Sequence, residues 1–470
     1  MLTERRPRLG AAAILVSPES PSCAILGAGP AGLVAADRLA RLGARVTVYE
    51  HKPSPARKLL MAGRGGLNIT HSESLDKFVT RYGAASARLE PILRDFPPDA
   101  LRAFCAELGE ETFVGSSGRV FPKSFKAAPL LRALLARLAA NGVTIATRHR
   151  FDGFDEEGAL RLIGAGGEAM LRRADAVVLA LGGASWPRLG ADGAWAGMLA
   201  ATGVAVTPLA PANCGVLIDW PEAFRAAFEG APLKTIALRH GEARIAGDVV
   251  VTRGGLEGGP VYALASALRR AIERDGAATM LVDLRPTLSL EALAAKLGRE
   301  RAKQSFANFL RKAAGLSKLE IALLRIAAPT PPEDAQGLAA LIKALPLPIA
   351  ATAGLARAIS TSGGVAFDEL NEDLMLKRLP GAFVAGEMLD FDAPTGGYLL
   401  QAAFSTGMAA ARGVSRRLDL KGAPFSRSAI ASGERGRSAP CDSLDESGLP
   451  PAKAAAPPPP LPARAARGER

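Results

Sequence analysis

The chain has 470 residues, 48% of them hydrophobic, which exceeds one typical domain and predicts two or three packed units. Its 58 Lys and Arg against 46 Asp and Glu give a formal net charge of +12, which could attract nucleic acid, an anionic membrane or an acidic substrate. We find the cations spread along the chain, with no Lys/Arg block interleaved with aromatic residues, so a solvated basic surface is expected and nucleic-acid binding is not.

The cysteines and the apolar runs exclude several further classes. The four cysteines have no CxxC pair, so neither a disulfide framework nor a zinc site is expected, and the composition fits a reducing cytoplasm. No apolar run approaches the ~18 to 20 residues that span a bilayer, so no membrane partner is expected. Residues 1–22 have a basic start and a short apolar patch without a clean cleavage site, which favours an N-terminal extension over a signal peptide.

Residues 23–50, CAILGAGPAGLVAADRLARLGARVTVYE, predict a strand, a glycine-rich turn, a helix and a second strand. In the GxGxxG pattern, Gly27 permits the tight turn, Gly29 lets the backbone approach a pyrophosphate and Gly32 lets helix and strand pack closely. Glu50 ends the second strand, where its carboxylate can accept hydrogen bonds from a ribose diol. The segment predicts dinucleotide binding rather than a structural turn, and the acid argues against a 2′-phosphate on this nucleotide.

The next part of the chain continues the alternation of helices and strands. Residues 128–142 predict a helix and 143–149 a strand, and residues 160–181 predict a hairpin that leads into a buried strand. The Gly-rich run 164–167 lies between two strands with no helix after it, which indicates a hairpin turn. We assign residues 23–193 to the first part of the nucleotide-binding domain.

The pattern changes after residue 193. Residues 194–350 carry strand-like pieces followed by Ala/Leu-rich helices, which predicts an inserted α+β domain with strands first and helices later. Residues 351–415 return to the style of the first part and are assigned to the same domain. Residues 416–470 are rich in Pro and Ala without hydrophobic periodicity, which predicts a disordered tail.

The C-terminal part favours FAD over NAD. Residues 381–387 form a short apolar strand ending in Gly386 and Glu387, and residues 395–401 form a Gly-rich helix start. A carboxylate at a strand end suits a ribityl chain, and a helix N-terminus suits the carbonyl edge of a flavin. An ordinary connection from a strand to a helix would show the same residue pattern. No second nicotinamide-type GxGxxG is present, so NAD(P)H is expected at most as a transient co-substrate.

Six segments together resemble the BaiN-like family of bacterial FAD-binding proteins, whose members are described as NAD(P)/FAD-dependent oxidoreductases or as aminoacetone oxidase-like. They are residues 27–32, 56–73, 118–131, 179–193, 360–365 and 381–407. The resemblance covers about residues 23–414 and implies a discontinuous glutathione-reductase-type Rossmann FAD domain interrupted by an insert.

The resemblance also implies a set of FAD contacts. Glycines of the first turn would hold the pyrophosphate, Glu50 the adenosine ribose, the backbone near His149 the adenine, and the C-terminal segment the ribityl chain and flavin ring. The residues so placed are Gly27, Gly29, Pro30, Ala31, Gly32, Glu50, Lys58, Gly63, Arg64, Asn68, Arg150, Ala180, Leu181, Gly182, Gly386, Glu387, Gly397, Tyr398 and Leu399.

One loop departs from the family pattern. Many members carry Ser-Gly-Gly-Gly-Arg-Cys-Asn where this chain has residues 62–68, so Gly66 stands at the Arg position and Leu67 at the Cys position. Thiol chemistry is therefore excluded there, and a substrate shared with those members is in doubt. Arg64, two positions before Gly66, could recover the lost charge.

The leading prediction is an FAD-dependent oxidoreductase that transfers a hydride to or from an unidentified small organic substrate, with the insert covering the flavin. We assign no catalytic residue and no metal site. Seven candidates have commoner structural or solvated roles: Asp390, Asp392, Trp186, Tyr398, His71, His149 and Cys214. Two alternatives stay open, an RNA-modifying flavoprotein and a non-catalytic FAD-binding redox sensor.

Overall fold

The computed structural model describes residues 19–301 and 303–421, without the side chain of Arg64. Most of the predicted N-terminal extension and of the predicted tail therefore lies outside the described residues. Helix α14 (Tyr398–Arg417) takes up the first two residues of the segment predicted as tail. Within the described part of the chain, no helix combines the length and the apolar character that crossing a membrane requires.

A five-stranded sheet of order β20-β10-β1-β2-β6 is the centre of the nucleotide-binding domain, and every neighbouring pair in it is parallel. The strands are β1 (Ser22–Leu26), β2 (Arg45–Glu50), β6 (Thr144–Thr147), β10 (Ala176–Leu179) and β20 (Ala382–Val384). Strands β1, β10 and β20 consist mainly of apolar residues, such as AVVL in β10, because both faces of the sheet are covered there. Strand β20, from the far end of the sequence, pairs with β10, so the predicted discontinuous α/β Rossmann domain is confirmed.

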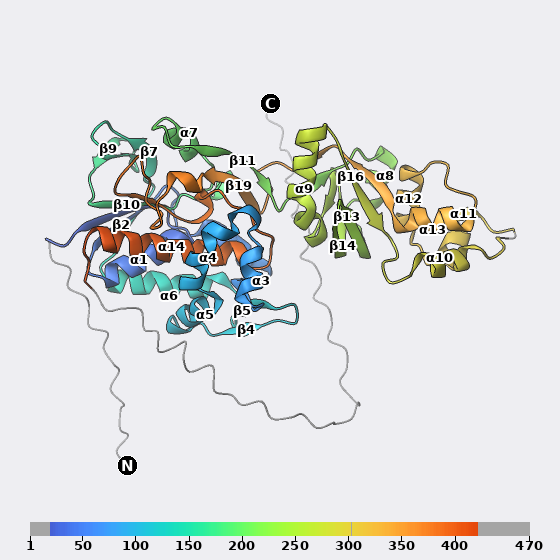
Figure 1. Cartoon of the computed structure of the whole chain (residues 1–470), viewed down its shortest axis with the longest axis horizontal. Coiled ribbons are helices and arrows are strands. Elements are labelled where there is room, and N and C mark those ends of the chain that lie inside the picture. The colour runs from blue at the N-terminus through green and yellow to red at the C-terminus, as the bar shows by residue number, and fades with distance from the viewer. Residues whose placement is uncertain (1–18, 302, 422–470) are drawn as a thin grey trace, which may run out of the picture. The chain divides into compact units, whose positions relative to one another are not determined.

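Two layers cover this sheet. On one face, Ile25 and Val178 pack with α1 (Pro30–Arg41), α6 (Ala127–Ala140) and α14, which Figure 1 shows running beside one another. On the other face, Leu26 and Leu179 pack with α7 (Trp195–Ala200) and with an antiparallel sheet. That sheet is formed by β7 (Arg150–Phe154), β8 (Leu160–Ile163) and β9 (Ala169–Arg172). The predicted hairpin turn is confirmed, because Gly164 N donates to Glu168 O at 2.8 Å.

The region between β2 and α6 is built from short elements that the sequence analysis does not predict. It holds α2 (Arg57–Ala62), α3 (Leu75–Thr80), α4 (Ser86–Asp95), α5 (Pro98–Glu107) and short 3-10 turns at Gly63–Gly65 and Gly83–Ala85. A small antiparallel sheet follows the order β3-β5-β4, with β3 (Thr70–His71), β4 (Thr112–Val114) and β5 (Arg119–Pro122).

The insert has its own sheet and its own core, which extends from Val216 to Ile349. Its antiparallel strands are β17 (Leu345–Ile349), β16 (Ala278–Asp283), β13 (Pro232–His240), β14 (Ala243–Thr252), β15 (Gly255–Glu257), β12 (Val216–Leu217) and β18 (Ala351–Thr352), in sheet order. The helices are α8 (Glu222–Phe228), α9 (Gly259–Asp275), α10 (Leu290–Leu297), α11 (Phe306–Ala313), α12 (Lys318–Ala327) and α13 (Ala335–Lys343). The bounds predicted for the insert, 194–350, stay a prediction.

The order of elements in the insert differs from the expected strands first and helices later. Strands β17 and β18 return to the sheet after the helices. Strand β17 is not predicted from the sequence, because it contains Pro346 and Pro348 and proline is rare within strands. The prolines are tolerated because β17 lies at the edge of the sheet, where a missing N–H leaves no neighbouring strand unpaired. Outside this sheet, β11 (Val206–Ala212) and β19 (Ser360–Val365) pair with each other where the chain leaves and re-enters the first domain.

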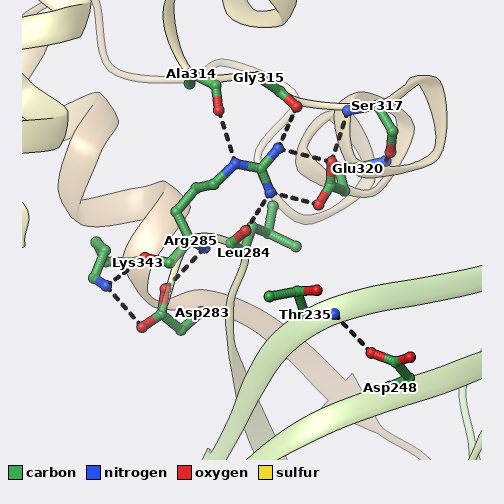
Figure 2. A network of polar contacts seen from close by, with 10 residues as sticks. All are labelled: Thr235, Asp248, Asp283, Leu284, Arg285, Ala314, Gly315, Ser317, Glu320 and Lys343. Atoms are coloured by element: carbon green, nitrogen blue, oxygen red, sulfur yellow. Dashed lines mark hydrogen bonds and ion pairs between the residues drawn. The ribbon is translucent and has the colours of Figure 1, made fainter. Parts of the chain in front are cut away.

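A partly buried arginine, Arg285, connects the end of β16 to the helices of the insert (Figure 2). The Arg285 guanidinium donates to Ala314 O at 2.7 Å and to both Glu320 carboxylate oxygens, at 2.6 and 3.0 Å. Glu320 also accepts a hydrogen bond from the backbone N–H of Ser317, the residue that caps the start of α12. Because the buried charges are paired and hydrogen-bonded, the network orders the helical part of the insert.

Candidate functional site

A cleft opens at the carboxyl edge of the parallel sheet, where open α/β folds bind their ligands. It holds about 1300 Å³ of space, counting the solvent at its mouth. Many of the residues predicted to contact FAD line it: Gly27, Gly29, Pro30, Ala31, Glu50, Lys58, Ala180, Leu181, Gly182, Gly386, Glu387 and Leu399. His149, predicted near the adenine, also lines the cleft.

The glycines of the first turn differ in what a side chain would meet. A Cβ on Gly27, whose φ is +102°, would lie 2.3 Å from Ala180 O, and one on Gly32 would lie 2.0 Å from Gly27 O. A Cβ on Gly29 would meet no protein atom within 4 Å. Two of the glycines therefore allow the turn to pack, and the third keeps open the space at the start of α1 that a pyrophosphate needs.

Glu50 and His51 form the wall next to this turn. Glu50 Oε2 accepts a hydrogen bond from Ala28 N at 3.0 Å, and Oε1 accepts one from Lys52 N at 2.8 Å. His51 Nε2 is buried in the cleft wall and has no hydrogen-bond partner, and burial lowers the pKa of this imidazole. An unpaired buried nitrogen beside a ribose-type carboxylate fits a nucleotide bound in the cleft. Sequence reasoning missed His51, although it directly follows Glu50.

At the other end of the cleft, Lys58 and Glu387 form an ion pair. Lys58 Nζ donates to Glu387 Oε2 at 2.7 Å and to Ser185 Oγ at 2.5 Å. Glu387 also accepts from Thr361 N at 3.0 Å and from Gly183 N at 3.3 Å. The carboxylate is therefore held between α2, the loop after β10 and the start of β19. Ser185 and Thr361 are further members of this cluster that sequence reasoning did not single out as site residues.

The remaining predicted contacts lie outside the lining of the cleft. Gly32 lies within α1 and Gly63 packs on α6, where a Cβ would lie 2.7 Å from Ala127 Cβ. Asn68 Nδ2 donates to Thr70 O and Val120 O, and Arg150 pairs with Asp152 at 3.4 Å. The structure leaves the Arg64 side chain undescribed, so its predicted replacement of the lost charge is untested.

Gly397 and Tyr398, at the start of α14, are also outside the lining. Gly397 lies so close to β3 that a Cβ would be 2.5 Å from Thr70 Cα. Tyr398 Oη donates to Glu73 Oε1 at 2.6 Å, and its ring stacks on that of His71. Tyr398 is thus held by its neighbours and not turned freely toward the cleft.

The other catalytic candidates of the sequence analysis have structural partners. Asp390 accepts from Thr207 Oγ1 at 2.6 Å, and Asp392 accepts from Ser266 Oγ on α9 at 2.5 Å. Burial raises the pKa of the Asp392 carboxyl, and it raises the pKa of the Cys214 thiol to about 11. The Trp186 ring packs against the Arg188 guanidinium. None of these side chains lines the cleft, and the described residues hold no cluster suited to a metal ion.

The profile described as "HI0933-like protein Rossmann domain" matches residues 21–413, which is most of the chain. The chain belongs to this HI0933-like family.

Two curated relatives are similar to this HI0933-like chain. The "3-dehydro-bile acid delta(4,6)-reductase" of Clostridium scindens is 28% identical over 408 residues, covering 84% of this chain and 98% of the relative. The "Ribosomal RNA dihydrouridine synthase" of Haemophilus influenzae is 49% identical over 49 residues, only 10% of this chain and 12% of that relative. The first similarity confirms the resemblance to the BaiN-like family.

Two solved structures are similar to this chain at low sequence identity. The 3-ketosteroid delta1-dehydrogenase of Sterolibacterium denitrificans has a TM-score of 0.49 and 13% identity, covering 84% of this chain and 100% of that chain. The 3-ketosteroid-delta4-(5alpha)-dehydrogenase of Rhodococcus jostii RHA1 has a TM-score of 0.46 and 17% identity, covering 88% of this chain and 100% of that chain.

The HI0933-like protein is an FAD-dependent oxidoreductase, and the alternative of a non-catalytic sensor is set aside. Its cleft fits the cofactor on two observations of this chain, the open space at Gly29 and the unpaired His51 nitrogen. Gly27 and Gly29 would hold the pyrophosphate, Glu50 the adenosine ribose, and Glu387 the ribityl chain.

Proposed function

We propose that this protein reduces a carbon–carbon double bond conjugated to a ring carbonyl, that is, a cyclic enone, in a small organic molecule. The observation that carries the proposal is the cleft in which the open turn at Gly29 and the Lys58–Glu387 pair face the same space. The relative from Clostridium scindens supports the choice of reaction, because its name describes reduction of double bonds in a 3-oxo bile acid. Steroid-like enones are therefore the first substrates to test.

The reaction balances with NAD(P)H as the proposed electron donor. One hydride adds to the carbon β to the carbonyl and one proton adds to the α carbon, while NAD(P)H becomes NAD(P)⁺. Bound FAD supplies the relay of two electrons between the two organic molecules. NAD(P)H would bind transiently, because the sequence contains no second, nicotinamide-type GxGxxG motif.

The residues of this chain would bind the cofactor, orient it and shield the reacting atoms from water. Backbone N–H groups at the start of α1 would bind the pyrophosphate. The Lys58 ammonium lies beside Glu387, where it would stabilise negative charge that develops during reduction. Apolar residues of the cleft exclude water from the reacting atoms: Phe391, Leu399 and Leu400. The proton donor to the α carbon is not assigned.

An anaerobic titration tests the donor and the reaction. The yellow protein is titrated with NADH and NADPH in turn, and the visible flavin band is followed. We expect rapid bleaching by one of them and recovery of the band on adding 4-androstene-3,17-dione, a steroid enone. Bleaching by dithionite but by neither nucleotide would refute NAD(P)H as donor, and a band that stays bleached with every enone tried would refute the reductase.

A second candidate substrate is a uracil base in RNA, whose 5,6-double bond is also conjugated to a ring carbonyl. The relative from Haemophilus influenzae, named for making dihydrouridine, supports it over a short match. Although the cations are otherwise spread along the chain, residues 296–318 carry a local group of seven cations against one acid, Glu300. All seven are exposed, and the described residues offer none of them an ion-pair partner: Lys296, Arg299, Arg301, Lys303, Arg311, Lys312 and Lys318.

Salt dependence separates the two candidates. If RNA is the substrate, its affinity should fall steeply between about 50 and 200 mM salt, since each phosphate contact releases counterions. The double variant Arg311→Gln, Lys312→Gln should bind RNA more weakly. Its plot of log affinity against log salt concentration should be less steep, by about the contribution of two phosphate contacts. The control variant Arg132→Gln, Arg172→Gln should change neither quantity. Binding that is absent at low salt would remove RNA as a candidate.

The cellular setting is part of the proposal. A cytoplasmic location agrees with Cys23, Cys105 and Cys214, which are buried free thiols. The insert, with its separate core, is proposed to cover the flavin and shape the substrate pocket.

A further inference from the structure

A further cavity lies in the insert, between one face of its sheet and two of its helices. Residues of β13, β14 and β16 line it on the side of the sheet, and residues of α10 and α13 line it on the other side. It holds about 750 Å³ of space, counting the solvent at its mouth. None of its lining residues lines the cleft of the Rossmann domain, so the insert has a candidate binding site of its own.

Positive charge dominates the lining of this cavity. Three cations, Arg239, Arg244 and Lys343, stand against one acid, Asp283, which leaves a formal charge of +2. Charges of one sign within a concave site that has apolar walls raise the local concentration of ions of the opposite sign. The cavity is therefore suited to an anion.

The one acid of the cavity already has its partners. Asp283 Oδ2 accepts from Lys343 Nζ at 2.8 Å and from Arg244 Nη2 at 3.3 Å, and Oδ1 accepts from Arg285 N at 3.0 Å (Figure 2). Lys343 Nζ also donates to Arg285 O at 2.8 Å and to Leu288 O at 2.7 Å, which uses all three of its donors. Lys343 and Asp283 thus form a fixed pair, and the two arginines carry the surplus charge.

The two arginines lie directly opposite each other on neighbouring strands. The register of β13 and β14 pairs Arg239 with Arg244, so both side chains are on the same face of the sheet. Like charges at directly opposite positions destabilise a sheet. The part of the chain that the structure describes offers the Arg239 side chain neither a hydrogen-bond partner nor an ion-pair partner. The donors of Arg239 are therefore available to a ligand in the cavity.

The shape and charge of the cavity favour a phosphate group over a carboxylate. A guanidinium binds phosphate oxygens through two parallel hydrogen bonds, and a phosphate has enough oxygens for two such groups, whereas a carboxylate has only two oxygens. A phosphate monoester carries about −1.5 to −2 charges at pH 7, which matches the +2 of the lining. Leu281, Leu290 and Ala340 add apolar surface against which the body of the ligand can pack.

We propose that Arg239 and Arg244 form a phosphate-binding site on the insert, whose ligand is a phosphate monoester with a flat or apolar body, such as a nucleotide. The inference goes beyond the proposed reduction of an enone and does not depend on it. The same phosphate chemistry can come from a free nucleotide or from the backbone of RNA, so the experiment includes both sources.

Isothermal titration calorimetry of the FAD-loaded protein tests the proposal, since bound FAD fills the nucleotide cleft. In phosphate-free buffer the probes are adenosine monophosphate, adenosine and an oligouridine without terminal phosphates. We expect adenosine monophosphate to bind and adenosine not to bind. In Arg239→Gln the dissociation constant for adenosine monophosphate should rise at least ~10-fold. Lys234→Gln is the control, because it removes one exposed charge from the same strand outside the cavity lining.

Thermal unfolding gives a second measurement that shows whether the variant is folded. Without ligand, Arg239→Gln should be at least as stable as the wild-type protein, because it removes one of two opposed like charges. Adenosine monophosphate should raise the thermal midpoint of the wild-type protein and of Lys234→Gln, and it should leave that of Arg239→Gln nearly unchanged.

Three results would overturn the phosphate site: equal affinity of wild type and Arg239→Gln for every probe, binding of adenosine as tight as that of its monophosphate, or no binding of any probe to the wild-type protein. Binding of oligouridine alone that is lost in Arg239→Gln would support the site and assign it to the backbone of RNA. None of these measurements involves flavin reduction. A phosphate site in a protein that reduces no enone, or the reverse, therefore refutes only one of the two proposals.

Discussion

Lys58 and Glu387 are 329 positions apart in the sequence, yet their side chains form an ion pair of 2.7 Å at the cleft. The pair joins α2, from the first part of the Rossmann domain, to the turn Gly386–Met388 from the second part. Because Glu387 keeps two backbone donors, Thr361 N and Gly183 N, the cluster can lose the lysine without leaving the carboxylate unpaired.

Replacing Lys58 with Met should therefore act on the bound cofactor more than on the fold. The loss of a positive charge disfavours the reduced, more negative state, so we expect the FAD midpoint potential to fall by roughly 15 to 30 mV, or ~0.7 to 1.4 kcal/mol for two electrons. A potentiometric titration measures this change. Lys58→Arg keeps the charge and should restore most of the potential, and equal potentials for Met and wild type would contradict the role.

Two glycine substitutions in the first turn should have opposite consequences. Gly29→Ala places a Cβ where no protein atom lies within 4 Å, so the apoprotein should fold normally while the dissociation constant for FAD rises at least ~10-fold. Gly32→Ala places a Cβ 2.0 Å from Gly27 O, so the apoprotein itself should lose ~1 to 3 kcal/mol of unfolding free energy. Urea unfolding of the apoproteins and FAD titration separate the two effects, and normal FAD affinity in Gly29→Ala would place the pyrophosphate elsewhere.

Short-range patterns in the sequence predict the parts of the site that depend on neighbouring residues. The turn at Gly27, the helix after it and Glu50 follow from residues within one βαβ unit, so spacing alone predicts them. The Lys58–Glu387 pair depends on segments that the fold brings together from opposite ends of the chain, and no local pattern contains that information. Strand β17 was missed for a different reason, since its prolines contradict strand propensity and only its edge position tolerates them.

The acid stability of the protein should depend on Glu73. Hydrogen bonds from Arg81, with a further one from Tyr398, lower the pKa of this carboxyl to about 2, against the opposing effect of burial. A pKa below the unfolded value of 4.5 means that the stabilisation is complete above about pH 4.5 and is lost as the pH falls toward 2. Glu73→Gln should therefore cost about 2 kcal/mol at pH 7, allowing for solvent screening, and nearly nothing at pH 2.

Urea unfolding at a series of pH values checks this expectation. The unfolding free energy of the wild-type protein should approach that of Glu73→Gln as the pH falls. Asp76→Asn, on an exposed carboxyl in the following helix, is a suitable control and should change the pH dependence little. A constant difference between wild type and Glu73→Gln across the whole range would show that the carboxyl does not titrate with the fold.

Replacing one partner of the Arg285–Glu320 pair should lower the free energy of unfolding more than replacing both partners. The side chains are 18% and 7% exposed, so Glu320→Ala leaves a largely buried guanidinium without its carboxylate and should cost ~3 kcal/mol or more. Arg285→Met combined with Glu320→Leu removes both charges and should cost less, because no buried ion is left unpaired. Neither residue lines the cleft, so the FAD content of the purified protein should stay the same in every variant. Urea unfolding of the holoproteins compares them, and a single variant as stable as the double one would mean that the ion pair contributes little to the order of the insert.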